Sequence, residues 1–171
     1  MKKYLFIIML VFAGTAGFAQ SDTDTTARYW KNKALPHFTL LNLDSTLFTE
    51  ANLTAGKYTI IMLFNPECEH CQNQFKALVN MPEVAASAQI VLSATETMDK
   101  IKKFYTKFEV AKYPFVHIAR DHNFTFGPIY QPKTIPVLVF YDQHNQFIAI
   151  KQGEAEKQQI INWLKKNQYP Q

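Results

Sequence analysis

The sequence has only two cysteines and five glycines among 171 residues, and its basic residues outnumber its acidic residues by little. Two cysteines are too few for a disulfide-dense scaffold or a four-cysteine zinc site. Few glycines, eight prolines and 47% hydrophobic residues exclude collagen-like, low-complexity and intrinsically disordered chains. The net charge of +4 at pH 7 falls to +2 without Lys2 and Lys3 of the N-terminal segment, since removal of two of the 18 basic residues leaves 16 against 14 acidic ones, and this excess is too weak to indicate a nucleic-acid partner. The length therefore predicts one globular domain with a hydrophobic core.

The N-terminal segment has the order of features of a secretory signal peptide. Lys2 and Lys3 precede an apolar run over residues 4–13, and small residues up to Ala19 follow. A membrane-spanning helix would need roughly 20 consecutive apolar residues, and this run is interrupted earlier by glycine. We predict a signal peptide over residues 1–19 and a flexible segment over 20–35. The protein is then expected to be exported and soluble, in the periplasm or another extracytoplasmic compartment. Because there is no cysteine near the cleavage site, lipid attachment at that site is excluded.

Patterns typical of strands and of helices alternate along residues 36–171. Two extended segments around a polar turn at 42–45 predict an N-terminal β-hairpin. The continuous apolar run 58–64 predicts a strand covered on both faces, followed by a helix that ends near Pro82. Further strands are expected over 89–94, 115–118, 137–141 and 146–151, with helices around 101–108, 124–130 and 160–164. This order predicts one α/β domain with a central mixed β-sheet flanked by helices.

The two cysteines form a Cys-x-x-Cys motif, Cys68-Glu69-His70-Cys71, where the buried strand turns into the helix. This spacing puts the two sulfurs about one helical turn apart, close enough for a disulfide. Cys68 is expected near the helix N-terminus, where unpaired N–H groups and the helix dipole stabilise a thiolate. That thiolate can attack a partner's disulfide, and Cys71 can then resolve the mixed disulfide. The motif predicts a redox-active dithiol that uses no metal and no further cofactor.

Two other interpretations of the cysteine pair stay open. An inert disulfide would close a loop too short to add much stability. A metal-handling or binding module for copper or zinc would use Cys68, Cys71 and His70, and zinc would need further ligands.

Several segments together resemble the thioredoxin-like superfamily and, within it, the exported TlpA-type thiol-disulfide reductases of the AhpC/TSA-thioredoxin-like group. These segments are residues 36–40, Gly56-Lys57, the strand ending at Phe64, the Cys-x-x-Cys motif, and Thr134-Ile135-Pro136. The resemblance implies a thioredoxin-like fold with an N-terminal β-hairpin extension. It also implies that Pro136 follows a cis peptide bond and faces the cysteines, and that Ile135 contacts the substrate. The expected partners are protein thiols and disulfides and a membrane electron-donor protein, and we expect a monomer.

Three departures from the family pattern concern the lost Trp, the added negative charge beside Cys68, and the amide at position 74. Glu67 stands where the family has Trp before the first cysteine, and this change removes an aromatic surface for partner docking. Glu67 and Glu69 add negative charge that disfavours a thiolate, whereas a protonated His70 would favour one. Gln74 stands where many members have Glu, and a neutral amide cannot act as an acid or base.

The motif and the resemblance together predict an exported thiol-disulfide oxidoreductase that reduces protein disulfides. Cys68 is the predicted nucleophile and Cys71 the resolving thiol. A thiol peroxidase is a third alternative, disfavoured because Asn65 stands where the related peroxiredoxins carry Thr or Ser.

Overall fold

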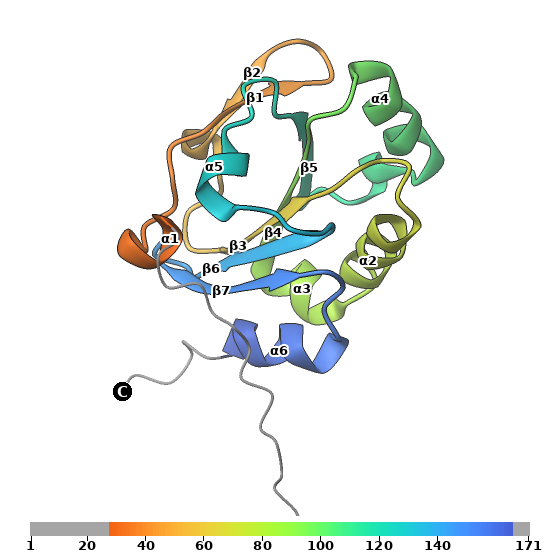
Figure 1. Ribbon diagram of the computed structural model, residues 1–171. Coiled ribbons are helices and arrows are strands. Elements are labelled where there is room, and N and C mark those ends of the chain that lie inside the picture. The colour runs from red at the N-terminus through yellow and green to blue at the C-terminus, as the bar shows by residue number, and fades with distance from the viewer. Residues whose placement is uncertain (1–27, 166–171) are drawn as a thin grey trace, which may run out of the picture.

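A seven-stranded mixed sheet forms the centre of the molecule, in the order β2-β1-β5-β4-β3-β6-β7 (Figure 1). The computed structural model describes residues 28–165, so the predicted signal peptide and its cleavage site lie outside the described residues. The strands are β1 (Thr39–Asn42), β2 (Leu47–Thr49), β3 (Tyr58–Leu63), β4 (Ala88–Ala94), β5 (Val116–Arg120), β6 (Val137–Tyr141) and β7 (Phe147–Gln152).

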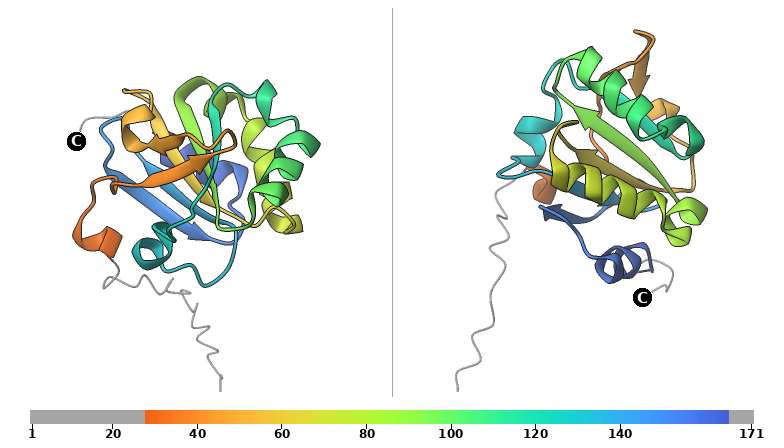
Figure 2. Two further views of the ribbon diagram at one scale, coloured as in Figure 1. Left: turned by 90° about the horizontal axis from the view of Figure 1, so that it is seen from above. Right: turned by 90° about the vertical axis from the view of Figure 1, so that its right-hand side faces the viewer.

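Helices cover both faces of this sheet. They are α1 (Arg28–Lys31), α2 (Glu69–Val79), α3 (Pro82–Ser87), α4 (Met98–Lys107), α5 (Phe126–Tyr130) and α6 (Lys157–Lys165), with 3-10 turns η1 (Glu50–Asn52) and η2 (Val110–Lys112). In Figure 1, α2 and α4 lie on one side of the sheet and α1 and α5 on the other, and the right-hand view of Figure 2 shows α2 and α4 in front of the strands. Over residues 28–165, every helix falls short of the length and apolar character needed to cross a bilayer.

Strand β3 has other elements packed on both of its faces. Successive side chains of a strand point to opposite sides, so alternate residues of β3 enter different clusters. Tyr58, Ile60 and Met62 pack with residues of α2, α3, α4 and α6. Ile61 and Leu63 pack with residues of α1, α5 and the β1–β2 hairpin. All six residues of β3 are buried. Two hydrophobic clusters are therefore formed on the two sides of one central strand.

The pairing of β3 determines what meets at one edge of the sheet. β3 runs parallel to β4, and β4 runs parallel to β5, so their carboxyl ends share an edge. β6 runs antiparallel to β3 and pairs Leu63 with Val137, so β6 begins where β3 ends. The turn after Phe64 and the residue before Val137 are consequently neighbours at this edge.

The mixed sheet, the N-terminal hairpin and the flanking helices confirm the predicted fold class. Two short helices were not predicted. Pro82 ends α2 as expected, but it also begins α3, because proline is tolerated in the first helical turn. Helix α1 has four residues, too few for a periodic pattern, and its Tyr29 packs on Phe147 with 5.2 Å between ring centroids. The domain boundaries stay predictions.

Asp121 connects the end of β5 to α5. Its buried carboxylate accepts hydrogen bonds from the backbone N–H groups of Thr125 (2.8 Å) and Phe126 (3.0 Å). The Asp121→Ala variant should lower the free energy of unfolding by about 1.5–3 kcal/mol, the usual size for hydrogen bonds to a charged group. Urea denaturation measures this change. Asp121→Asn, which keeps one acceptor, should lose less, and an unchanged midpoint for Asp121→Ala would contradict this account of α5.

Candidate functional site

Cys68 and Cys71 lie at the start of α2, immediately beyond the end of β3. Cys68 is the N-cap residue of α2, and Cys71 lies in its first turn. The N–H of Cys68 donates to the Asn65 carbonyl (3.1 Å), and its own carbonyl accepts from the N–H of Gln72 (3.0 Å). The Asn65 side-chain oxygen accepts from the N–H of Glu67 (2.8 Å), the local bond typical of an Asx turn. The turn between strand and helix is thus held by its own backbone and by Asn65.

The two cysteines have different environments. Both are free thiols; Cys68 is half-buried and Cys71 is completely buried. Burial raises the pKa of the Cys71 thiol to about 12, with smaller contributions from hydrogen bonding to Cys68 and from the charges of Cys68 and Glu154, while a backbone hydrogen bond from Asn65 acts in the opposite direction. Cys71 is therefore a protonated thiol at neutral pH, and Cys68 is the sulfur that solvent and partners can reach.

Glu67 belongs to a network of charges on one side of the cysteine turn. Lys100 of α4 contacts the Glu67 carboxylate at 2.7 Å and the Glu96 carboxylate at 3.4 Å. The Asn65 amide donates to Glu96 at 2.9 Å. These contacts raise the pKa of Lys100, first through its hydrogen bonds to Glu67 and Glu96. Glu67 is accordingly paired with a lysine of α4, which it shares with Glu96.

His70 and Gln74 face the loop between β7 and α6. The His70 Nδ1 atom lies 2.5 Å from a carboxylate oxygen of Glu154. The Gln74 side chain is buried, and its oxygen accepts from the N–H of Ala155 at 2.7 Å. Gln74 Nε2 is a buried donor for which no partner was found among the described residues. The amide at this position fastens α2 to the loop, a structural role that the sequence did not indicate.

Pro136 and Ile135 precede β6 at the same edge of the sheet. The Ile135–Pro136 peptide bond is cis, as the resemblance implies. The carbonyl of Pro136 accepts from the N–H of Gly153 (2.8 Å), in the same loop that contacts His70. Gly153 has a φ of 79°, a left-handed conformation that favours glycine. Ile135 is 36% exposed and is one of the exposed large apolar side chains of the described residues.

The structure brings the predicted site residues to one edge, from two parts of the chain. Glu67 to Gln74 surround the N-terminal half of α2, and Ile135 and Pro136 lie beside the turn that precedes it. Glu69 is exposed in the first turn of α2. Over residues 28–165, no group of three or more His, Cys, Asp or Glu side chains is arranged to hold a metal ion.

Sequence analysis missed Lys100, Glu96 and Glu154. Glu96 and Lys100 have the i,i+4 spacing of a helical ion pair, a signal that was present but says nothing about Glu67. Glu154 is 84 residues from His70 in the chain, and no local pattern indicates such a contact.

No protein-family model matches the chain, and no curated protein sequence matches it. Solved structures do match. A secreted Mycobacterium tuberculosis disulfide oxidoreductase homologous to E. coli DsbE is 19% identical with a TM-score of 0.59, covering 74% of this chain and 93% of its own. An exposed lipoprotein thioredoxin of Streptococcus pneumoniae is 18% identical with a TM-score of 0.60, covering 77% of this chain and 99% of its own. MTB DsbF, in mixed oxidised and reduced forms, is 20% identical with a TM-score of 0.57, covering 75% of this chain and 93% of its own.

These likenesses extend over most of the described residues at low sequence identity, so they concern the fold. They agree with the mixed sheet and with the helices on both of its faces. The chain has a thioredoxin-like fold.

Proposed function

We propose that this protein is an exported thiol-disulfide oxidoreductase of the TlpA type that reduces disulfides in partner proteins. The observation that carries the proposal is the inequality of the two sulfurs. Cys68 is accessible at the N-terminus of α2, and Cys71 is a buried thiol one helical turn on. A dithiol that attacks and then releases a partner needs one exposed nucleophile and one protected resolving sulfur.

The reaction proceeds by two exchanges. The Cys68 thiolate attacks one sulfur of a partner disulfide; a Cys68–partner disulfide forms, and the other partner sulfur leaves as a thiolate that takes a proton from water. Cys71 then loses its proton to water and attacks the Cys68 sulfur, which forms the Cys68–Cys71 disulfide and releases the second partner sulfur as a thiolate that takes up a proton. Two electrons and two protons pass to the partner disulfide. A membrane electron-donor protein with its own dithiol would return the two electrons.

Formation of the mixed disulfide prepares Cys71 for the second exchange. The negative charge of Cys68 and its hydrogen bond both contribute to the raised pKa of Cys71. A sulfur in a disulfide carries no charge, so the contribution from the charge of Cys68 ends when Cys68 joins the partner, while the larger contribution from burial remains. Cys71 is then easier to deprotonate at the step in which it must attack.

The surface around Cys68 supports docking of an extended polypeptide. Ile135 offers an exposed apolar side chain directly before the buried Pro136. Glu67 and Glu69 flank Cys68, and we assign them, with His70, to tuning of the sulfur and of the approaching partner. The paired state of Glu67 with Lys100 limits its effect on the thiolate.

Export is supported by the charged, apolar and small-residue order of residues 1–19. Two of the solved structures with this fold come from proteins described as secreted and as an exposed lipoprotein. An extracytoplasmic reductase works where disulfides persist, which is why it needs a dedicated electron donor.

The difference between the cysteines predicts selective alkylation. Treatment of the reduced protein with iodoacetamide between pH 7 and 9 should modify Cys68 and leave Cys71 unmodified, because only the thiolate reacts and the pKa of Cys71 is about 12. Peptide mass spectrometry after quenching in acid reads the two sites separately. Equal labelling of both cysteines, or faster labelling of Cys71, would contradict the assigned roles.

Cysteine substitutions test the reaction itself. Cys71→Ser should accumulate a mixed disulfide with a model protein disulfide such as that of insulin, because nothing resolves it, and Cys68→Ser should form none. Both variants should lose multiple-turnover reduction of insulin in the presence of a dithiol. The reduced wild-type protein serves as the control for insulin binding and turnover.

The same preparation separates the alternatives. Failure of Cys71→Ser to trap any partner, together with stoichiometric copper or zinc in the purified wild type, would replace the proposal by metal handling. Consumption of peroxide without a second thiol protein would favour a thiol peroxidase.

A further inference from the structure

Three consecutive residues of the β7–α6 loop contact three different parts of the dithiol site. The N–H of Gly153 donates to the carbonyl of Pro136, and the N–H of Ala155 donates to the side chain of Gln74. Between them, the Glu154 carboxylate lies 2.5 Å from His70, the residue next to Cys71. The loop therefore joins the start of β6 to the start of α2. Glu154 is the member of the three that acts through its side chain.

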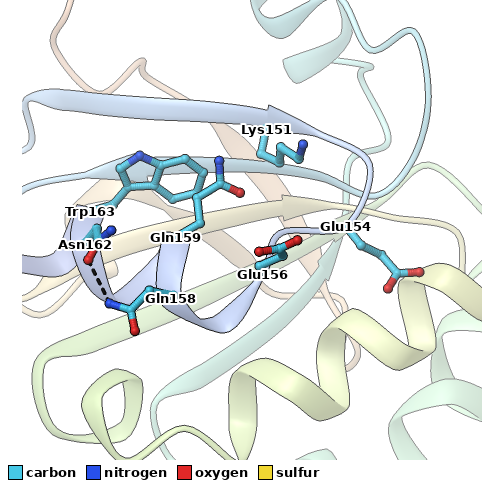
Figure 3. A pocket seen from close by; sticks show the side chains of 7 residues that line it. All are labelled: Lys151, Glu154, Glu156, Gln158, Gln159, Asn162 and Trp163. Atoms are coloured by element: carbon cyan, nitrogen blue, oxygen red, sulfur yellow. Dashed lines mark hydrogen bonds between the residues drawn. The ribbon is translucent and has the colours of Figure 1, made fainter.

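The Glu154 carboxylate contacts His70 of α2, although Lys151 lines the same groove as Glu154. Glu154 lines one end of an open groove of about 530 Å³ that Lys151, Glu156 and Trp163 also line. In Figure 3 its carboxylate points away from Trp163 and out of this groove. Over residues 28–165, the ion pair found for Glu154 is with His70 and not with Lys151. The contact with His70 is thus a specific one and does not follow from general charge neutralisation in the groove.

We propose that Glu154 is a positioning residue for the dithiol reaction: its carboxylate holds the His70 ring against the β7–α6 loop and places a negative charge beside the turn that carries Cys68 and Cys71. This role deepens the proposed function and rests on it. A charge that destabilises thiolates destabilises the reduced state, in which thiolates exist, and leaves the neutral disulfide unaffected. Glu154 should therefore make the pair a stronger reductant.

The other carboxylates near the cysteine turn have contacts and surroundings different from those of Glu154. Glu67 and Glu96 share the ammonium of Lys100 on the opposite side of the turn. Glu69 is exposed to solvent, where its charge is screened. Glu154 is also exposed, with 45% of its side chain accessible, but it contacts the residue next to Cys71, and its charge adds a small contribution to the raised pKa of Cys71, whose largest cause is burial.

Two substitutions separate the charge from the contact. Glu154→Gln keeps an oxygen that can accept from His70 and removes the charge, whereas Glu154→Ala removes both. Both should shift the equilibrium with glutathione toward the dithiol by about two- to fivefold, the size expected for a partly exposed charge. Both should also move the pH profile of Cys68 alkylation to lower pH.

Glu156→Gln is the matched control. It removes the same charge two residues further on, and the Glu156 side chain is exposed, lines the same groove and makes no side-chain contact found among residues 28–165. The ring nitrogen resonances of His70 in NMR spectra should change in Glu154→Ala and stay as in wild type in Glu156→Gln. A merely structural role would alter the melting temperature of Glu154→Ala without moving the alkylation profile of Glu154→Gln.

The outcomes distinguish failure of this inference from failure of the proposed function. A wild type that exchanges with glutathione, with Glu154→Gln and Glu154→Ala indistinguishable from Glu156→Gln, would overturn the role of Glu154 alone. A shift of Glu154→Gln toward the disulfide would also overturn it, since the sign would be wrong. A wild type that never exchanges with glutathione would overturn both.

Discussion

Burial of β3 on both faces is the constraint on which the rest of the structure depends. Its six residues are all buried, and it pairs with β4 on one side and β6 on the other. Its side chains alternate between two separate clusters, and it has one register with each neighbour, with Leu63 opposite Ser93 of β4 and opposite Val137 of β6. The place where β3 ends is therefore fixed, and with it the turn that carries Cys68 and Cys71.

The chemistry of the site follows from what that turn meets. Helix α2 begins at the turn, which leaves Cys68 at the helix N-terminus and directs Cys71 into the core. Burial then makes the two sulfurs chemically unequal, since a buried thiol resists ionisation. On one side of the turn Lys100 neutralises Glu67, and on the other the β7–α6 loop binds His70 and Gln74. The reactive pair is surrounded by contacts from elements that are distant in the sequence.

Local patterns were sufficient to predict the fold class and the position of the two cysteines at the start of a helix after a buried strand. The run 58–64 is apolar except for Thr59 and has no charged residue, so its burial on both faces could be predicted, and Cys-x-x-Cys after such a run has few structural interpretations. The position of Pro136 beside the motif came from the resemblance and not from periodicity. Helix α3 was missed because Pro82 is both a stop signal for α2 and an acceptable first residue of a new helix.

Contacts through space were not predictable in the same way. Glu154 reaches His70 only because β7 returns antiparallel to β6 and places its following loop at the α2 end of the sheet. The amide of Gln74 could be recognised as incapable of acid–base chemistry, but its bond to Ala155 depends on that same return. Lys100 lies on a helix whose charged residues are typical of a solvated face, and nothing in its spacing indicates Glu67.

The reduction potential of the Cys68–Cys71 pair tests the central claim most directly. The mature protein would be equilibrated with defined ratios of reduced and oxidised glutathione, quenched in acid and analysed for free thiols. A disulfide reductase should give a reduction potential of about −270 mV, the value of thioredoxin. A value near −120 mV, that of the oxidant DsbA, would contradict the assigned direction of electron flow, as it would mean that the pair donates disulfides.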